Sequence, residues 1–300
     1  MIEKQTVLVL GAGASQPYGF PTGGELRKLI CDDLSWHDAA LRDRISAQFI
    51  QRFVMRFRCA PQSTVDRFLA RHTDFVNVGK LAIASILIAR EFASDLSPQK
   101  DNWYGYLWSR LETDWDDFSK NKLKIITFNY DRSLEQFLLQ SILQTFKRSL
   151  DESYSLAKCV PIVHVYGDLG KLGEFSTDNR SRPYRMFQEE RFDSIDIGIR
   201  RLRVIGEQSA GLDQNLTEIH NTLASAEAIC FLGFGFDETN FKLLKIDELL
   251  TKTKPPQIFG STKGLEAAEV TRVRNWCNGK IVDFSANCCE KFLRHHGVLI

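Results

Sequence analysis

Three short motifs carry side chains whose types and spacing could do chemistry in this 300-residue chain. Gly11 and Gly13 follow an apolar run, and glycines before a helix let backbone amides cradle a phosphate. Asn129 and Asp131 are two residues apart, so they share a side if the strand before them continues. His164 is a candidate general base, because an unperturbed histidine has a pKa of about 6.5. A tight turn, a helix cap and a buried histidine bonded to backbone are the alternatives.

Two further motifs follow apolar runs near the C-terminal end of the chain. Gly233-Phe234-Gly235 comes directly after one run, and glycines there permit close approach of a ligand. Asn240 follows, although it could instead cap a helix beginning at Phe241. Ser261 lies after the next run, where a simple turn is the alternative.

The elements that must position these motifs alternate between strands and helices. Helical patterns such as Ser133–Leu143 and Leu212–Leu223 separate apolar, β-branched runs. Strands are expected at Thr6–Leu10, Lys124–Phe128, Pro161–Tyr166, Ala228–Leu232, Gln257–Phe259 and Lys280–Phe284. This alternation predicts an α/β fold, a doubly wound Rossmann-like parallel sheet with the motifs at the carboxyl ends of its strands.

A long helical stretch interrupts this alternation. Thr22 and Glu25 have the spacing of a capping box, which predicts a helix from about Gly23. Residues 25–120 show helical patterns and no good strand. We therefore expect a helical insertion subdomain at 25–120 and a Rossmann-like domain at 1–24 and 121–300. The polar residues 171–195 are expected to form an excursion or a mobile loop.

Composition narrows the class of protein. Lys and Arg number 39 against 38 Asp and Glu, so no global basic field indicates nucleic-acid binding. Seven cysteines without C-x-x-C spacing argue against disulfides and a zinc site, so we expect no metal and a cytoplasmic location. The longest apolar stretch, Leu81–Ala89, is far shorter than the roughly 20 residues of a membrane span.

The order of the motifs resembles the sirtuin-like family, in particular the sirtuin-like NAD-hydrolysing domains of prokaryotic anti-phage defence proteins. The likeness extends from residue 6 to about residue 262. It rests on Gly11-Ala12-Gly13-Ala14-Ser15 with Gly19-Phe20-Pro21-Thr22, on Thr127-Phe128-Asn129-Tyr130-Asp131, on Gly233-Phe234-Gly235 with Asn240, and on Val65-Asp66-Arg67-Phe68-Leu69. The chain departs from sirtuin deacylases in lacking their four-cysteine zinc module. It also has Tyr166 directly before Gly167, where the family usually has its catalytic histidine.

The resemblance implies an NAD glycohydrolase that cleaves the nicotinamide–ribose bond and releases nicotinamide and ADP-ribose. NAD would be the substrate, and the protein would act in antiviral defence by depleting it. Asn129, His164 and Asp131 would be the catalytic residues. The residues implied in NAD binding are Gly11, Ala12, Gly13, Ser15, Phe20, Pro21, Thr22, Gly233, Phe234, Gly235, Asn240 and Ser261.

Two other functions are consistent with the motifs. Tyr166 at the usual histidine position would suit a non-enzymatic sensor of NAD or ADP-ribose, and a protein deacylase would need a peptide cleft beside the nucleotide. Because an uncontrolled NAD hydrolase would be toxic, we expect control by a homo-oligomer, by a partner defence protein or by both. The sequence leaves open whether His164 or Tyr166 occupies the base position, and whether cyclic ADP-ribose is a product.

Overall fold

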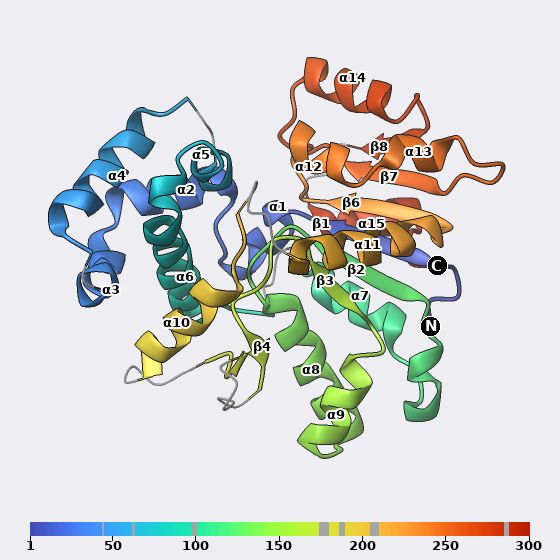
Figure 1. Cartoon of the computed structure of the whole chain (residues 1–300). Coiled ribbons are helices and arrows are strands. Elements are labelled where there is room, and N and C mark those ends of the chain that lie inside the picture. The colour runs from blue at the N-terminus through green and yellow to red at the C-terminus, as the bar shows by residue number, and fades with distance from the viewer. Residues whose placement is uncertain are drawn as a thin grey trace.

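The computed structural model describes residues 1–43, 45–61, 64–97, 101–173, 180–185, 190–204, 210–284 and 288–300. Its centre is a six-stranded parallel sheet with the strand order β3-β2-β1-β6-β7-β8. The strands are β1 (Thr6–Leu10), β2 (Leu123–Thr127), β3 (Ile162–His164), β6 (Ala228–Leu232), β7 (Gln257–Ser261) and β8 (Ile281–Phe284). Counted along the chain, this order is that of the doubly wound Rossmann fold. The predicted α/β fold class is confirmed (Figure 1).

β1 lies at the centre of the sheet because every one of its residues is apolar or buried. It pairs with β2 on one side and β6 on the other, with Thr6 opposite Leu123 and Ala228. All residues of β1 and β6 are buried, as expected of parallel strands covered on both faces. The strand expected at Pro161–Tyr166 is shorter than predicted, since β3 ends at His164 and a turn follows. Tyr166 therefore does not share a strand face with His164.

Helices cover both faces of the sheet. In Figure 1, α11 lies in front of β1 and β2, whereas α7 and α15 lie behind the sheet. The covering helices are α7 (Trp103–Leu111), α8 (Ser133–Phe146), α9 (Leu150–Ala157), α11 (Ala210–Ala224), α12 (Glu238–Leu243), α13 (Ile246–Leu250), α14 (Ala267–Trp276) and α15 (Cys289–His296). α7 comes from the stretch predicted as the helical insertion, but it packs against α8 and α15 of the Rossmann-like part.

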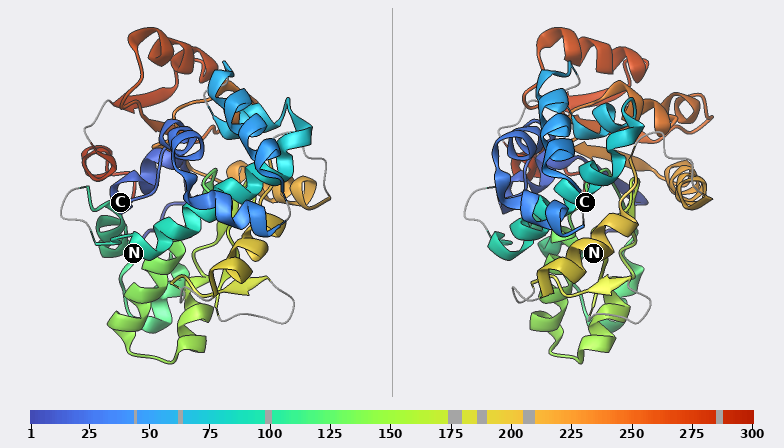
Figure 2. Two further views of the ribbon diagram at one scale, coloured as in Figure 1. Left: turned by 90° about the vertical axis from the view of Figure 1, so that its left-hand side faces the viewer. Right: turned by 60° about the vertical axis from the view of Figure 1, so that its left-hand side comes forward.

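A second group of helices lies beyond the carboxyl ends of the strands, on the side away from both termini (Figures 1 and 2). It contains α2 (Gly23–Asp32), α3 (His37–Arg42), α4 (Ala47–Cys59), α5 (Val65–Leu69), α6 (Val76–Ala93) and α10 (Arg191–Arg201), and we call it the helical layer. The capping box at the start of α2 is confirmed: Thr22 N–H donates to the Glu25 carboxylate at 2.8 Å, and Thr22 Oγ1 accepts from Glu25 N–H. α10 comes from much later in the chain, yet it packs on α6.

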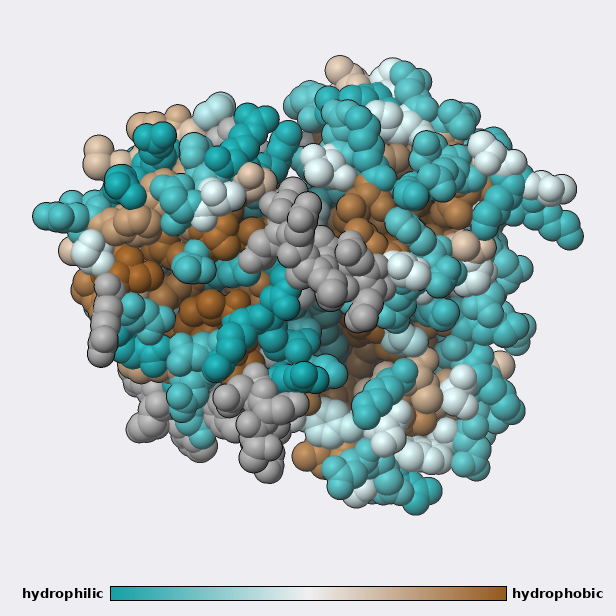
Figure 3. Space-filling model, viewed as in Figure 1, coloured by the Kyte–Doolittle hydropathy of each residue, from teal (hydrophilic) through white to brown (hydrophobic). Residues whose placement is uncertain are grey.

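α6 is the buried axis of the helical layer. Its residues Val78–Ile88 are all buried, so its apolar side chains face neighbours in every direction. Phenylalanine rings of α4 and α5, including Phe53, Phe57 and Phe68, form one aromatic cluster beside it. In the space-filling view, apolar side chains show between polar ones over this layer (Figure 3). Among the helices that the structure describes, none combines the length and apolar character needed to cross a bilayer.

The polar stretch predicted as an excursion contains some regular structure. β4 (Lys171–Leu172) pairs with β5 (Ser181–Arg182) in a separate two-stranded sheet, and α10 begins at Arg191. Residues 174–179 and 186–189 of this stretch lie outside the described residues. Arg182 is fully buried although its surroundings in the sequence are polar.

A buried ion cluster explains the position of Arg182. The Glu91 carboxylate of α6 accepts from Arg132 Nε at 2.9 Å, from Arg132 Nη2 at 2.8 Å and from Arg182 Nη2 at 2.8 Å. All three side chains are at most 1% exposed. Backbone carbonyls of Gly170 and Pro183 accept further bonds from Arg132. The cluster therefore joins the helical layer, the segment before α8 and β5.

Replacing Glu91 with alanine should strongly destabilise the protein, because two guanidinium groups would remain buried without their carboxylate. We expect the free energy of unfolding in urea to fall by about 3–5 kcal/mol. The exposed Glu238–Lys242 pair on α12 provides a control, and Glu238→Ala should leave the unfolding midpoint unchanged. If both substitutions lowered the free energy of unfolding equally, the buried cluster would not stabilise the fold more than an exposed ion pair does.

Candidate functional site

The carboxyl ends of β1, β2 and β3 meet at one place. Asn129 lies two residues after β2, and its Nδ2 donates to the carbonyl oxygen of Gly11, which follows β1. His164 ends β3, and its Nδ1 lies 2.8 Å from the carbonyl oxygen of Asn129. Both residues are only 8% exposed. Three motifs far apart in the sequence thus come together at the edge where α/β folds bind ligands.

Asn129 is fixed by its own amide. Nδ2 donates to Gly11 O at 3.1 Å and to the Ser15 hydroxyl at 3.0 Å, and the Asn129 backbone N–H donates to Thr127 Oγ1. These contacts use both amide hydrogens. The oxygen Oδ1 has no partner in the described part of the chain, so it is the atom of this side chain that a water or a hydroxyl group can reach.

The glycines of the first motif contact the glycine of the fourth. Gly13 N–H donates to Gly233 O at 3.0 Å, and Gly11 N–H donates to Leu232 O. A Cβ on Gly11 would lie 2.5 Å from Gly233 O and from the Cα of Phe234. The protein's own backbone therefore occupies the close approach that these glycines allow. Ala12, at the first position of the short helix α1 (Ala12–Ser15), retains an amide that its helix cannot use.

Asp131 lies just before α8 and is buried. Its Oδ1 accepts from Ser133 N–H at 3.1 Å and from the Ser133 hydroxyl, which in turn contacts the Tyr104 hydroxyl at 2.7 Å. Burial raises the pKa of the Asp131 carboxyl above its ordinary value, while hydrogen bonds from Ser133 and Ser15 oppose that shift. Asp131 thus orders the start of α8 and belongs to the same polar network as Asn129. β2 ends at Thr127, so strand geometry does not place the two side chains together.

His164 forms an ion pair that the sequence alone did not indicate. Its Nε2 lies 2.6 Å from Glu135 Oε1 on α8, and its Nδ1 faces the Asn129 carbonyl. Burial lowers the pKa of His164, but the charge of Glu135 and its hydrogen bond outweigh burial and raise the pKa to about 9. The imidazole is therefore protonated at neutral pH. Glu135 lies in the first turn of α8, and no local spacing in the sequence signals its contact with His164.

Asp168 and Arg201 form a second ion pair close to His164. Arg201 donates two hydrogen bonds to the two carboxylate oxygens of Asp168. Burial alone would raise the pKa of Asp168, but the bonds from Arg201 and the charge of His164 lower it to about 2. Two ion pairs, His164–Glu135 and Asp168–Arg201, thus lie at the carboxyl end of β3.

Tyr166 binds a residue from the late glycine motif. Its hydroxyl donates to Asn240 Oδ1 at 2.8 Å, and its ring lies edge-on to Phe128, which also contacts Phe234. Asn240 does not begin a helix, because α12 starts at Glu238 and Asp237 caps it by accepting from Thr239 and Asn240. The suggestion that Asn240 caps a helix at Phe241 is therefore wrong.

The other predicted binding residues lie at different depths. Phe20 is buried, Pro21 is half-buried, and both line a cavity of about 400 Å³ with Lys28 and Arg90. Thr22 caps α2. Gly235 is exposed, and Ser261 is buried at the end of β7, two strands away from β1.

The helical layer reaches the site through α5. The Tyr130 hydroxyl contacts the carboxyl of Asp66 and lies 3.0 Å from the carbonyl oxygen of Arg203. Burial raises the pKa of Asp66, while the hydrogen bond from Tyr130 opposes that shift. Arg67 Nη1 lies 3.3 Å from Asp237 Oδ2. The Val65–Leu69 motif thus links the helical layer to the carboxyl edge of the sheet.

No model of a known protein family matches the chain, and no curated protein matches it. The resemblance to sirtuin-like domains therefore rests on the motifs and their order. Among the described residues, no group of three or more His, Cys, Asp or Glu side chains could hold a metal ion. All seven cysteines are free thiols.

Two alanine substitutions can test whether the first glycine motif packs on Gly233. Gly233 and Gly235 both have positive φ angles, +57° and +67°, so alanine at either position costs about 1–2 kcal/mol of backbone strain. A Cβ on Gly233 would also lie 2.1 Å from Ala14 N, whereas one on Gly235 has no described atom within 4 Å. Urea unfolding should show Gly233→Ala to be less stable than Gly235→Ala by about 1–3 kcal/mol. Equal stabilities would show that α1 does not pack on this turn.

The His164–Glu135 pair should make stability depend on pH. Because the pKa of His164 is raised from 6.5 to about 9 on folding, its contribution is complete below pH 6.5 and is lost as pH rises through 9. The stability of wild type relative to Glu135→Gln should therefore fall by about 1–3 kcal/mol from neutral to alkaline pH. NMR titration of the His164 ring should show a midpoint near 9. Glu135→Gln should lower that midpoint and Glu290→Gln on α15 should not, whereas a wild-type midpoint near the ordinary value would refute the pairing.

Proposed function

We propose that the protein is an NAD glycohydrolase that cleaves the bond between nicotinamide and ribose. One observation carries the proposal: Asn129 is held between the Gly11 turn and Ser15, with Oδ1 available, at the carboxyl edge of a Rossmann-order sheet. This edge lies next to β1 and β6, where the direction of strand addition reverses and dinucleotides bind in such folds. NAD is proposed as the dinucleotide because the order of the motifs resembles that of sirtuin-like domains.

Cleavage of the nicotinamide–ribose bond requires few catalytic groups from the protein. Nicotinamide leaves as a neutral group from a cationic nitrogen, so no general acid is required. Positive charge develops on the ribose, and a water must approach its anomeric carbon. Asn129 Oδ1 can accept a hydrogen bond from that water or from a ribose hydroxyl. Asp131 is joined to Asn129 through Ser15, and its carboxylate form would stabilise the developing cation if the ribose binds beside it.

The difficult step is removal of the proton from the attacking water. His164 is protonated at neutral pH and both of its ring nitrogens are engaged, so it cannot accept a proton while Glu135 is paired with it. Separating Glu135 from His164 would lower the pKa of the imidazole and make it a base. Control by a homo-oligomer or by a partner defence protein could act through this contact, and depletion of NAD would then be conditional.

A second candidate function is a non-enzymatic sensor of NAD or ADP-ribose. The engaged nitrogens of His164 favour it, as does Tyr166, whose hydroxyl is bonded to Asn240. A sensor would bind the nucleotide tightly and release no nicotinamide under any activating condition.

Turnover of NAD by purified wild type and three variants tests these alternatives. Nicotinamide release should fall at least about 10²-fold in Asn129→Ala, the lower end of the range for general-base or oriented-water catalysis. His164→Ala should lose as much if the histidine is the base, whereas loss in Tyr166→Phe alone would assign that role to Tyr166. Asn275→Ala on the exposed face of α14 is the matched control and should retain the wild-type rate.

Two outcomes would reject the hydrolase. One is an Asn129→Ala variant that hydrolyses NAD at the wild-type rate. The other is tight binding of NAD by wild type, measured by calorimetry, with no nicotinamide released either by the purified chain or together with its co-purifying partners. Urea unfolding of each variant separates loss of activity from loss of the fold.

A further inference from the structure

β3 is an edge strand, and one side of its backbone faces away from the sheet. Ile125 N–H donates to Pro161 O, and Val165 N–H donates to Thr127 O. Because the bonding residues alternate along a parallel strand, Ile162 and His164 direct their N–H and C=O groups to the open side. The His164 carbonyl accepts from the Asn215 side chain at 3.2 Å. The other outward groups form a short row with which another strand could pair.

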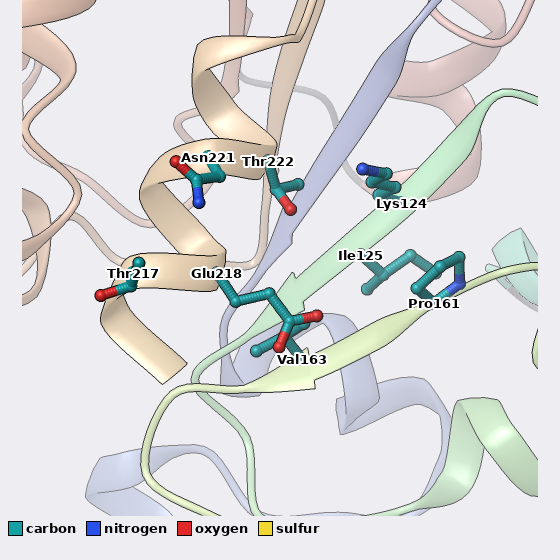
Figure 4. A pocket seen from close by; sticks show the side chains of 8 residues that line it. All are labelled: Lys124, Ile125, Pro161, Val163, Thr217, Glu218, Asn221 and Thr222. Carbon is teal, nitrogen blue, oxygen red and sulfur yellow. The ribbon is translucent and has the colours of Figure 1, made fainter. Parts of the chain in front are cut away.

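A cavity of about 600 Å³ lies on the face of β3 that is covered by α11 (Figure 4). Lys124, Ile125 and Val163 form its floor, and polar side chains of α11 form its wall. In Figure 4, Glu218 extends from α11 across the cavity toward Val163. Most of the exposed lining of this cavity is apolar, and the polar groups lie on the α11 wall, so the cavity would accept a small side chain that combines a methyl group with a hydroxyl, as threonine does.

A second cavity, of about 490 Å³, lies toward α8 and α9. Its walls are mostly apolar, and His164 and Glu135 line it as well. The apolar lining includes Leu138, Leu139, Ala157, Val160, Ile162 and Leu172. This cavity would accept apolar side chains.

A third cavity, of about 470 Å³, continues past the carboxyl end of β3 to Asp168 and Arg203. All three cavities share Val163 and Glu218, so they form one groove that follows the strand edge.

The rim of the groove is mainly positive. Lys158 and Lys171 are exposed, and neither has an ion pair among the described residues. Arg203 lies at the same end of the groove as Lys171. Asp168 is paired with Arg201 and Glu135 with His164, which leaves Glu218 on α11 as the unpaired carboxylate among the described lining residues. An acidic residue near Lys171 would complement this rim.

We propose that the edge of β3 binds an extended segment of a partner protein, which adds a strand to the sheet and has alternating apolar and polar side chains with an acidic residue near Lys171. Alternate side chains of an added strand point to opposite faces. One set would enter the cavity beside α8 and α9, and the other would enter the cavity beside α11, where it meets the polar side chains of that helix. Backbone bonds give such a complex its affinity, and the two cavities give it specificity.

The probe is a fluorescein-labelled peptide, Asp-Val-Thr-Val-Thr-Val-Asp, whose binding to the full chain is followed by fluorescence anisotropy. We compare it with two peptides that carry N-methyl groups on one or the other alternate set of amides. Only one set can face β3, so one methylated peptide should bind like the parent. The other should bind about three- to tenfold more weakly for each backbone bond removed. This comparison needs no protein variant, so it does not depend on how well a variant folds.

Three substitutions locate the site. Ile162→Pro removes an outward N–H and leaves the residues that pair with β2 in place, and it should weaken binding at least about threefold, whereas Ile162→Val should not. Leu139→Glu puts a charge into the apolar cavity and should abolish binding, while Gln140→Glu, exposed on the same helix, is its control. Lys171→Glu should weaken binding in a salt-dependent way, and Lys254→Glu should have no effect.

Several outcomes would overturn the proposal. They are no anisotropy change at millimolar protein, equal binding of both methylated peptides, and binding that Ile162→Pro and Leu139→Glu leave intact. A wild-type dimer in sedimentation that Ile162→Pro converts to monomer would make a second copy of this chain the occupant instead of a partner.

The His164–Glu135 pair lines the groove, and only the link between the groove and catalysis rests on the proposed function. Nicotinamide release measured with and without the peptide tests that link separately. Peptide binding without NAD turnover under any condition would support the groove as a binding site and reject the hydrolase. Turnover without peptide binding would support the hydrolase and reject the groove.

Discussion

The arrangement of the molecule depends on the pairing of Glu91 with Arg132 and Arg182 away from water. A buried guanidinium is tolerated only where a carboxylate and carbonyl oxygens meet its planar set of donors. Glu91 comes from the centre of the helical layer, Arg132 from the segment after β2, and Arg182 from β5. These three segments cannot move apart without leaving charges unpaired in the interior. Because Asp131 directly precedes Arg132, the same constraint sets the position of the candidate site.

Most polar groups of the candidate site form hydrogen bonds with one another. Asn129, Ser15, Asp131, Ser133 and Tyr104 form one polar network, and the Gly11 turn packs directly on Gly233. Such a network holds its members in one geometry, which favours catalysis if a substrate fits and favours simple recognition if none reacts. The oxygen of Asn129 is the atom that distinguishes this network from a purely structural one.

His164 lies between the candidate site and the groove along β3. Its ring faces Asn129 on one side and Glu135 on the other, and Glu135 lines the groove along β3. A hydrolase that consumes NAD needs an inactive resting state, and a protonated imidazole is one way to provide it. A strand added at β3 would lie against this ion pair. Partner binding and proton acceptance would then be alternatives at the same residue.

The sequence by itself determined the sheet and the edge where the motifs gather. Runs such as Thr6–Leu10 and Ala228–Leu232 are apolar and end in glycines, so local chemistry specifies both the strand and the turn after it. The capping box at Thr22 is equally local. Only the tertiary structure decided that His164 pairs with Glu135, that Gly11 packs on Gly233, that Arg182 reaches Glu91, and that β3 ends before Tyr166. These contacts join residues tens to hundreds of positions apart, and no local periodicity encodes them. They follow from burial, which forces each polar group to find a partner wherever the fold brings one near.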